Sequence, residues 1–373
     1  MDILKLDLAN RRQVHEFLSL PFRLYRDNSQ WVPALQIDER LRLNPKRYPF
    51  FKQSNAAFFL ARENDQTIGR LAILDSSIYN EFNNERTGFF YLFECENDQT
   101  TASELFASGF EWAQKRGLNK ILGPKGFTAL DGLGLLVKGF ERRPALGLPY
   151  NLPYYPTLIE AQGFEKKNDI VSGYLSATIQ FPTRIEELAE RIKERRGLHI
   201  IRFRNRRELR AAPGYLKALY NGVMGGTSGG TPITDEEINT LADQMLWFAD
   251  PRLIKIVMKY EKPVGFLLAY PDISAALQKT KGKLFPFGWV IILKELRTTE
   301  WININGAGII EEYRGLGGMA ILYSEMFKSV AENPKYLHAE VVQIGMENDK
   351  MQREMENFGV DFYKIHRMYQ KYI

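Results

Sequence analysis

Hydrophobic and polar positions along the chain follow an order of strand-like and helix-like segments that occurs twice. In the first half, apolar residues recur at strand spacing and then at helical spacing, over 55–62, 68–75, 88–93 and 101–115. In the second half the same order returns, over 253–260, 263–270, 301–310 and 318–328. Two copies of one α/β unit are the simplest explanation of this repeat.

Further elements flank both repeats. A helix is expected over 7–20, where Pro21 should stop it, because proline lacks the N–H that continues a helix. Thr234 and Glu237 form a capping box for a helix that reaches Trp247. The apolar run 288–294 predicts a strand. The remaining predicted strands and helices cover 120–122, 170–175, 185–196, 198–203, 215–219, 336–343, 349–358 and 362–369.

Length and composition indicate a folded two-domain protein. A chain of 373 residues favours two domains, because single cores stop growing near roughly 250 residues. We expect an N-terminal domain over 1–177 and a C-terminal domain over 178–373. With 45% hydrophobic and 25% charged residues, the composition is that of a globular protein rather than a disordered or fibrous one.

The net charge and the cysteine content indicate the kind of ligand and the cellular compartment to expect. The net charge of +5 suits an acidic ligand without demanding nucleic acid. Cys95 is the single cysteine, which excludes an intramolecular disulfide and fits a reducing compartment. The first twelve residues lack the apolar core of a signal peptide, and no apolar run approaches the ~18 residues of a membrane span. We therefore expect a cytoplasmic protein with no membrane partner.

Two other kinds of site are not expected. No metal-ligand spacing connects the four histidines, His15, His199, His338 and His366. Segment 191–210 holds nine Lys or Arg against two Glu, but aromatic interleaving is limited to Phe203. A solvated helix face and linker is therefore favoured there over a nucleic-acid site.

The segment 301–328 carries the clearest chemical signal. A buried strand leads into a basic, glycine-rich turn at Arg314–Gly318, and a long amphipathic helix follows. Such a turn leaves several backbone N–H groups without intrahelical partners, and the helix dipole adds partial positive charge at the same place. The turn therefore suits phosphate, although glycines at such a joint also occur simply because the turn needs positive φ.

This segment resembles the phosphate-binding turn of the GNAT N-acetyltransferase superfamily. The family signature is Arg/Gln-x-x-Gly-x-Gly/Ala, and the turn matches it from Arg314 to Gly318 but departs from it at Met319. Downstream, Asn348 and the pair Phe358–Gly359 match a second family feature. The first half looks like a degenerate copy, since the acidic segment 96–101 lacks the arginine and both glycines.

The resemblance implies both a fold and a donor. It implies an α/β (α+β) protein with two GNAT-like domains, each a mixed, mostly antiparallel sheet flanked by helices. Acetyl-CoA, or another acyl-CoA, would be the co-substrate, with no metal. The residues implied to bind it are Ile309, Ile310, Arg314, Gly315, Leu316, Gly317, Gly318, Met319 and Asn348.

The catalytic side of the resemblance is weaker. Family members often use a tyrosine acid four residues before the helix-ending glycine, and Met355 stands there in this chain. Tyr313 and Tyr323 are substitutes by residue type only. Glu340 and Glu300 are the carboxylates best placed on strands to act as general base.

The resemblance implies an N-acyltransferase, with acetyl as the expected acyl group and a small-molecule amine as acceptor. Asn303 and Asn305 are further candidates to orient an amine or a water. The glycine-rich segment 221–232 is either a mobile acceptor loop or a plain linker. The main alternative is a non-catalytic module that binds acyl-CoA or another small molecule. Transfer from a larger aminoacyl donor and formation of a homodimer both stay open.

Overall fold

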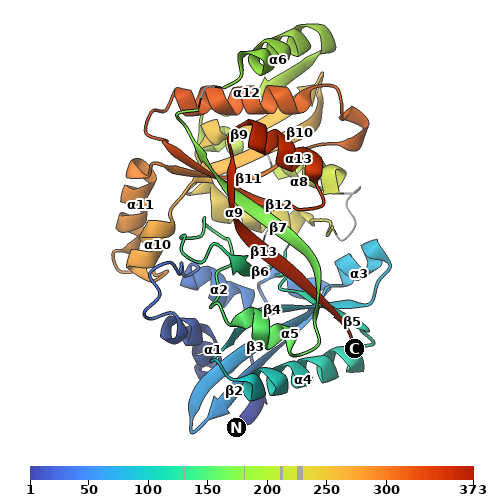
Figure 1. Ribbon diagram of the computed structural model, residues 1–373, viewed down its shortest axis with the longest axis vertical. Coiled ribbons are helices and arrows are strands. Elements are labelled where there is room, and N and C mark those ends of the chain that lie inside the picture. The colour runs from blue at the N-terminus through green and yellow to red at the C-terminus, as the bar shows by residue number, and fades with distance from the viewer. Residues whose placement is uncertain (129–130, 180, 211–212, 225–229) are drawn as a thin grey trace.

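A computed structural model describes the chain except for residues 129–130, 180, 211–212 and 225–229 (Figure 1). In the first half the described elements are β1 (Asp2–Lys5), α1 (Arg11–Leu24), α2 (Gln36–Arg42), η1 (Pro49–Lys52), β2 (Asn55–Glu63), β3 (Gln66–Asp75), α3 (Ser77–Asn83), β4 (Thr87–Cys95), α4 (Gln99–Lys115), β5 (Lys120–Gly123), β6 (Leu135–Lys138), α5 (Tyr155–Glu160) and β7 (Glu165–Ser176).

The second half keeps the order of the main strands, with α10 and α11 between β10 and β11 where the first half has α3 alone between β3 and β4. Its described elements are α6 (Thr183–Arg196), β8 (Leu198–Ile201), α7 (Arg206–Leu209), α8 (Pro213–Met224), α9 (Asp235–Leu246), η2 (Pro251–Leu253), β9 (Ile254–Lys259), β10 (Lys262–Pro271), α10 (Ser274–Thr280), α11 (Gly288–Thr298), β11 (Trp301–Ile309), η3 (Glu311–Tyr313), α12 (Gly318–Ala331), β12 (His338–Gly345), α13 (Asp349–Asn357) and β13 (Asp361–Tyr372).

The strands of both halves join into one mixed sheet. Among the described residues it has thirteen strands in the order β1-β2-β3-β4-β5-β13-β7-β12-β11-β10-β9-β8, and β6 pairs with β13 off this path. Two neighbouring pairs are parallel, β4 with β5 and β11 with β12, and they occupy equivalent places in the two halves. The mixed, mostly antiparallel α/β fold expected from the sequence is confirmed.

The two halves are joined by an exchange of strands at the centre of the sheet. β7 begins beside the end of β13 in the first half and ends between β12 and the start of β13 in the second half. β13 runs the other way and finishes against β5 of the first half, where Tyr372 pairs with Lys120. Figure 1 shows these two long strands running together through the middle of the molecule. Each half therefore completes the sheet of the other.

Helices cover both faces of the sheet in the second half. On one face α12 packs Ile321, Leu322 and Met326 against strand residues that include Val257 and Ile302. On the other face α8 and α9 pack on the alternate strand residues, among them Ile256 and Met258 and others of the same cluster. Because strand side chains alternate between faces, the residues of β11 and β12 face a different set of helices on each side of the sheet.

The helix expected to stop at Pro21 continues to Leu24. Proline removes the hydrogen bond to the carbonyl four residues earlier, which here belongs to Phe17. The Arg70 guanidinium donates to that carbonyl oxygen at 2.8 Å. A side chain from β3 thus satisfies the group that proline leaves open, and the helix persists.

The expected strand over 288–294 is wrong, because this segment is the helix α11. Its β-branched run suggested a strand, but Gly288 and Ile292 lie one helical turn apart and are both buried. Gly288 packs so close to the Lys283 carbonyl that a Cβ would lie 1.8 Å from its oxygen. The capping box of α9 is confirmed, with the Thr234 N–H donating to Glu237 and the Glu237 N–H donating to Thr234.

A buried histidine on β13 makes stability depend on pH. His366 pairs with Ile170 of β7, and burial lowers the pKa of its imidazole from 6.5 to about 4. The unfolded chain takes up this proton at higher pH than the folded chain. His366 therefore contributes stability that is full above pH 6.5 and is lost as the pH falls toward 4, by up to about 3 kcal/mol.

Urea unfolding between pH 7 and pH 4.5 measures this effect. We expect the His366→Gln variant to lose less of its free energy of unfolding over that range than the unaltered chain, because glutamine does not titrate. Parallel slopes for the two proteins would show that His366 is not the group responsible.

Candidate active site

The turn between β11 and α12 keeps the geometry of an anion site. Gly315 has φ +78° and is exposed, and a Cβ there would meet nothing within 4 Å. Gly317, with φ +88°, is the N-cap residue of α12 and has no side chain to cap the helix, whose first turn holds no acidic residue. The N–H groups at this helix start are therefore available to an anion.

The equivalent turn of the first half is closed. There Asp98 caps α4, and its carboxylate accepts hydrogen bonds from the N–H and the hydroxyl of Thr101. Glu96 adds a second carboxylate, in an ion pair with Arg23. Negative charge at this helix start disfavours phosphate. The first half, whose sequence already looks degenerate here, therefore has no open anion site at this turn.

Two guanidinium groups lie beside the open turn. Arg314 is half exposed, with its Nε 3.4 Å from the Ile309 carbonyl and an ion pair to Glu311 at 3.8 Å. Arg196, at the end of α6, donates to the Gly315 carbonyl at 3.4 Å. α6 keeps the expected solvated basic face, with Arg191 and Arg195 exposed, and its apolar side packs on α12, where Ile192 fills the space beside Gly317. The turn thus combines open N–H groups with positive charge.

β11 and β12 separate just beyond this point. Their parallel pairing runs from Trp301 and His338 to Ile304 and Val341 and ends there. Gly306, with φ +124°, lies next to a β-bulge between β10 and β11. The strands therefore form a splay at Ile304 and Val341.

Beyond the bulge, the backbone N–H of Ile310 is already bonded to the Val264 carbonyl at 2.9 Å. Because N–H groups alternate along an extended chain, that of Ile309 faces the splay instead. Of the two isoleucines implied by the resemblance, Ile309 therefore has the available N–H.

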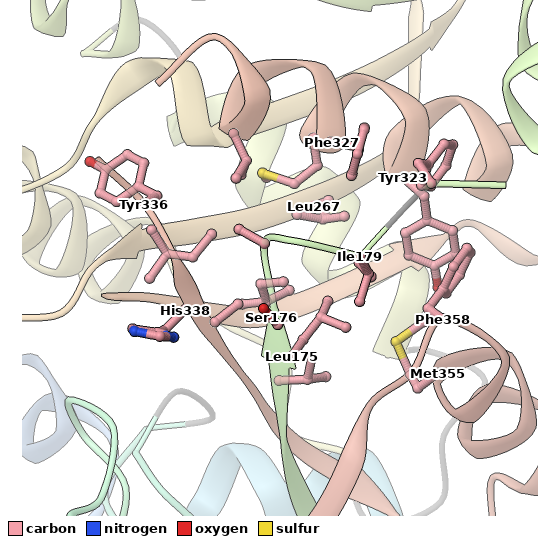
Figure 2. A pocket seen from close by; sticks show the side chains of 18 residues that line it. Leu175, Ser176, Ile179, Leu267, Tyr323, Phe327, Tyr336, His338, Met355 and Phe358 are labelled. Carbon is pink, nitrogen blue, oxygen red and sulfur yellow. The ribbon is translucent and has the colours of Figure 1, made fainter. Parts of the chain in front are cut away.

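An apolar pocket lies on the α12 side of the splay. Its volume is about 100 Å³, and Figure 2 shows side chains from β7, β12, α12 and α13 converging on it. Ile304 and Val341, the last paired residues of the splay, line it together with Phe327 and Met355. Met355, at the family's tyrosine position, is therefore part of an apolar wall.

A much larger cavity lies between the two halves, with a volume of about 970 Å³. It reaches β11 at Asn305, Gly306 and Ala307, and its lining comes from α1, α2 and β4 of the first half and from α8, α9 and β10 of the second. Most lining side chains are apolar. Two ion pairs interrupt the lining, the half-buried Arg42–Asp131 pair at 2.6 Å and the buried Arg70–Glu94 pair at 3.7 Å.

Tyr270 and Asn305 form a polar pair where the cavity meets β11. The Asn305 amide donates to the Tyr270 hydroxyl at 2.6 Å, and that hydroxyl donates to the Leu146 carbonyl at 3.2 Å. Burial raises the pKa of Tyr270 well above 10, so its hydroxyl stays protonated. Sequence reasoning singled out Asn305 but missed Tyr270. The strand pattern of 263–270 indicates which face of the sheet Tyr270 occupies, but it does not identify Asn305 as its partner.

Glu340 lies in a buried ion pair away from both cavities. Lys364 donates to its carboxylate at 2.7 Å and to the Arg143 carbonyl at 2.8 Å, and neither charged residue lines the pocket or the cavity. Burial raises the pKa of Glu340 and lowers that of Lys364. A base role for Glu340 stays a prediction.

The other predicted residues are spread over the second half. Glu300 is exposed before β11, and its carbonyl accepts hydrogen bonds from the N–H groups of 337 and 338. Tyr313 lies in η3 with Lys262 above its ring, at 5.2 Å from the centroid. Asn348 caps α13 through the N–H of Met351 at 3.1 Å. The structure does not bring these three together.

The remaining expectations concern the glycine-rich loop and metals. Residues 225–229, within the expected acceptor loop at 221–232, lie outside the described residues. Across the part of the chain that the structure describes, no group of three or more His, Cys, Asp or Glu could hold a metal ion.

Comparisons with known proteins agree with this architecture. No family model matches the chain. It is 26% identical over 370 residues to Protein YghO of Escherichia coli strain K12, covering 98% of this chain and 94% of that protein. It is also 26% identical over 379 residues to the bacterial ceramide synthase of Caulobacter vibrioides, covering 99% of this chain and 97% of that protein.

Among solved structures, the chain is similar to one described as a tandem GNAT protein from the clavulanic acid biosynthesis pathway. The TM-score is 0.55 at 10% identity, covering 100% of this chain and 98% of that one. At this identity the likeness concerns the fold.

Proposed function

We propose, on the premise that this chain has the tandem GNAT fold, that it is an acyl-CoA-dependent N-acyltransferase whose acceptor is a long-chain, lipid-like amine. The observation that carries the proposal is the position of the β11 splay. An apolar pocket opens on one side of it and a large, mostly apolar cavity on the other. Donor and acceptor could therefore meet at β11 from opposite faces.

The donor would be held by the turn before α12. Gly315 is open, the start of α12 makes no side-chain cap, and Arg314 and Arg196 supply positive charge, which together fit a pyrophosphate. When bound, acyl-CoA would supply an acyl group activated as a thioester. The Ile309 N–H, which faces the splay, would stabilise charge on the thioester carbonyl oxygen.

The apolar pocket favours an acyl group longer than the acetyl expected from sequence. Its roughly 100 Å³ is several times the roughly 10–15 Å³ that a water-sized group needs. Ile304 and Val341 line it at the end of the splay, so a chain leaving the thioester could enter it directly.

The cavity between the halves favours an acceptor with a long apolar body and a small polar head. Its volume of about 970 Å³ lies at the upper end of the roughly 300–1,000 Å³ range of ligand pockets. The similarity to a protein named bacterial ceramide synthase supports this class of acceptor, because a ceramide is the amide of a fatty acid and a long-chain amino alcohol.

As the amine nitrogen attacks the thioester carbon and the C–S bond breaks, the Tyr270 hydroxyl would give its proton to the departing thiolate and take up one from the nitrogen. This hydroxyl stays protonated, lies in the cavity wall and is held by Asn305, next to the bulge. Tyr270 would thus take the role of the tyrosine that GNAT proteins often have at the position occupied here by Met355.

A non-catalytic acyl-CoA-binding module is the second candidate. Met355 favours it, because the usual acid is missing from the usual place. The two functions differ in turnover: a module would bind acyl-CoA and release no thiol with any amine.

Release of free thiol from acyl-CoA in the presence of sphinganine tests the proposal. We expect turnover with palmitoyl-CoA to exceed turnover with acetyl-CoA. Gly315→Asp places a negative charge at the open turn and should weaken acyl-CoA binding at least about tenfold, while Gly315→Asn, of the same shape and equally tolerant of positive φ, should stay within about threefold. Equal binding by the two variants would remove the turn from the donor site, and binding without thiol release would favour the module.

A further inference from the structure

The helix α11 and the segment before it expose an unusual number of large apolar side chains. Phe285 is 76% exposed and Phe287 is 72% exposed. We call the α11 apolar face the group formed by these two residues with Trp289, Val290, Ile291 and Leu293, all of them exposed. Scattered single apolar residues are normal on a protein surface, but a contiguous group of this kind marks an interaction site.

Packing explains why these side chains point outward. α11 buries a narrow stripe, Gly288 and Ile292, against α10, where Ala276 and Leu277 are buried in the same cluster. The close contact of Gly288 with the Lys283 carbonyl leaves the rest of the helix surface turned away. In Figure 1, α10 and α11 lie together at one side of the molecule, outside the central sheet.

The α11 apolar face has a basic border. The segment from Gln278 to Arg297 has one acidic residue, Glu295, against five exposed basic ones, Lys279, Lys281, Lys283, Lys294 and Arg297. Within the described residues, none of these five forms an ion pair with a carboxylate. Aromatic and aliphatic side chains bordered by lysines are the composition of helices that lie in the interface of an anionic membrane.

The same border forms part of the rim of the cavity between the halves. Lys281 and Lys283 are exposed and also line that cavity, beside the segment 31–36 of the first half. This segment is tied to the rim, since the Gln36 N–H donates to the Gly282 carbonyl at 2.9 Å and its amide donates to the Lys281 carbonyl at 3.1 Å. The cavity therefore reaches the surface within a few residues of Phe285.

We propose that the α11 apolar face docks on the surface of a membrane that contains anionic lipids, and that the cavity takes its lipid-like acceptor from that surface. Uptake of the acceptor from the membrane rests on the proposed function, whereas docking of the α11 apolar face does not. Aromatic side chains enter the boundary between headgroups and acyl chains, while the lysines bind anionic headgroups.

Docking of this kind needs no spanning segment. In the part of the chain that the structure describes, no helix is both long and apolar enough to cross a membrane. The expectation of no membrane partner considered only such spans.

Flotation with vesicles tests the docking step on the full chain. We expect binding to vesicles of phosphatidylcholine with phosphatidylglycerol and at least tenfold weaker binding to phosphatidylcholine alone. The triple variant Phe285→Ser, Phe287→Ser, Trp289→Ser should lose binding at least tenfold. The matched control Phe82→Ser, Tyr260→Ser, Tyr372→Ser removes three aromatic side chains exposed elsewhere and should bind as the unaltered chain does.

A second variant keeps the test decisive if the aromatic variant misfolds. Lys279→Gln, Lys294→Gln, Arg297→Gln removes charge from exposed positions outside the cavity lining and should also weaken binding to anionic vesicles. Absence of vesicle binding by the unaltered chain would overturn the proposal. So would light scattering that shows a dimer which the aromatic variant breaks, because the occupant would then be a second copy.

The substrate route has its own readout. Thiol release with sphinganine in anionic vesicles should fall at least tenfold in the aromatic variant, while release with sphinganine in detergent micelles should stay within about threefold. Vesicle binding without thiol release in either setting would reject the proposed function and leave the docking surface standing. An equal loss of thiol release by the aromatic variant in vesicles and in micelles would reject uptake of the acceptor from the membrane.

Discussion

We expect Tyr270→Phe to lower kcat for thiol release by about 10²–10⁴-fold and to leave the Kd for acyl-CoA within about threefold. The variant removes only the hydroxyl that Asn305 holds next to the β11 bulge. Phenylalanine keeps the ring in contact with Phe248, whose centroid lies 5.8 Å away, so the fold should persist. In the proposed site the donor binds at the turn around Gly315, which this variant leaves unchanged, so we expect its Kd to be unaffected.

Tyr220→Phe is the matched control. Tyr220 also lines the cavity, and burial also raises the pKa of its hydroxyl, but it comes from α8 rather than from the strands beside the splay. Thiol release and Kd, measured for both variants with palmitoyl-CoA and sphinganine, separate a proton donor from a cavity wall. Similar losses in the two variants would mean that Tyr270 shapes the cavity and donates no proton.

Lys364→Met lowers the free energy of unfolding by about 3–5 kcal/mol, because it leaves Glu340 as an unpaired buried carboxylate. Lys364 is 1% exposed and Glu340 3% exposed, so water cannot take the place of either partner. The pair connects β12 to β13, the strand that passes from one half into the other. Urea unfolding measures the loss.

The double variant Glu340→Leu, Lys364→Met should recover most of that loss, since replacing a buried ion pair with apolar residues of similar volume is often nearly neutral. It also separates structure from chemistry. Glu340 lines neither the pocket nor the cavity, so we expect the folded double variant to keep its thiol release. A stable double variant without activity would restore Glu340 as the general base. A single variant within about 1 kcal/mol of the unaltered chain would show that the pair carries little stability.

Much of the local structure could be predicted from the sequence. The repeated order of elements, the capping box at Thr234 and the glycine turn before α12 depend on residues close together in the chain, and each recurs in the structure. The donor side of the candidate site was predictable for the same reason, because Arg314–Gly318 is one continuous segment whose backbone conformation glycine permits.

Predictions from the local sequence pattern were wrong where contacts with residues distant in the chain decided the secondary structure. The run 288–294 has strand-like composition, but α10 buries only its Gly288 and Ile292 stripe, which requires a helix. Pro21 has a helix-stopping side chain, but Arg70, 49 positions away in the chain, bonds the carbonyl that it leaves open.

The sequence by itself determined most of the elements, the order in which they repeat and the glycine-rich turn before α12, since these depend on contacts between near neighbours in the chain. Only the tertiary structure decided the exchange of β7 and β13, the pairing of Tyr270 with Asn305, the burial of Glu340 with Lys364 and the cavity between the halves. Alternation along a strand tells which face a side chain occupies, but it does not tell which distant strand lies beside it. Those partners are set by how the whole chain buries its apolar surface.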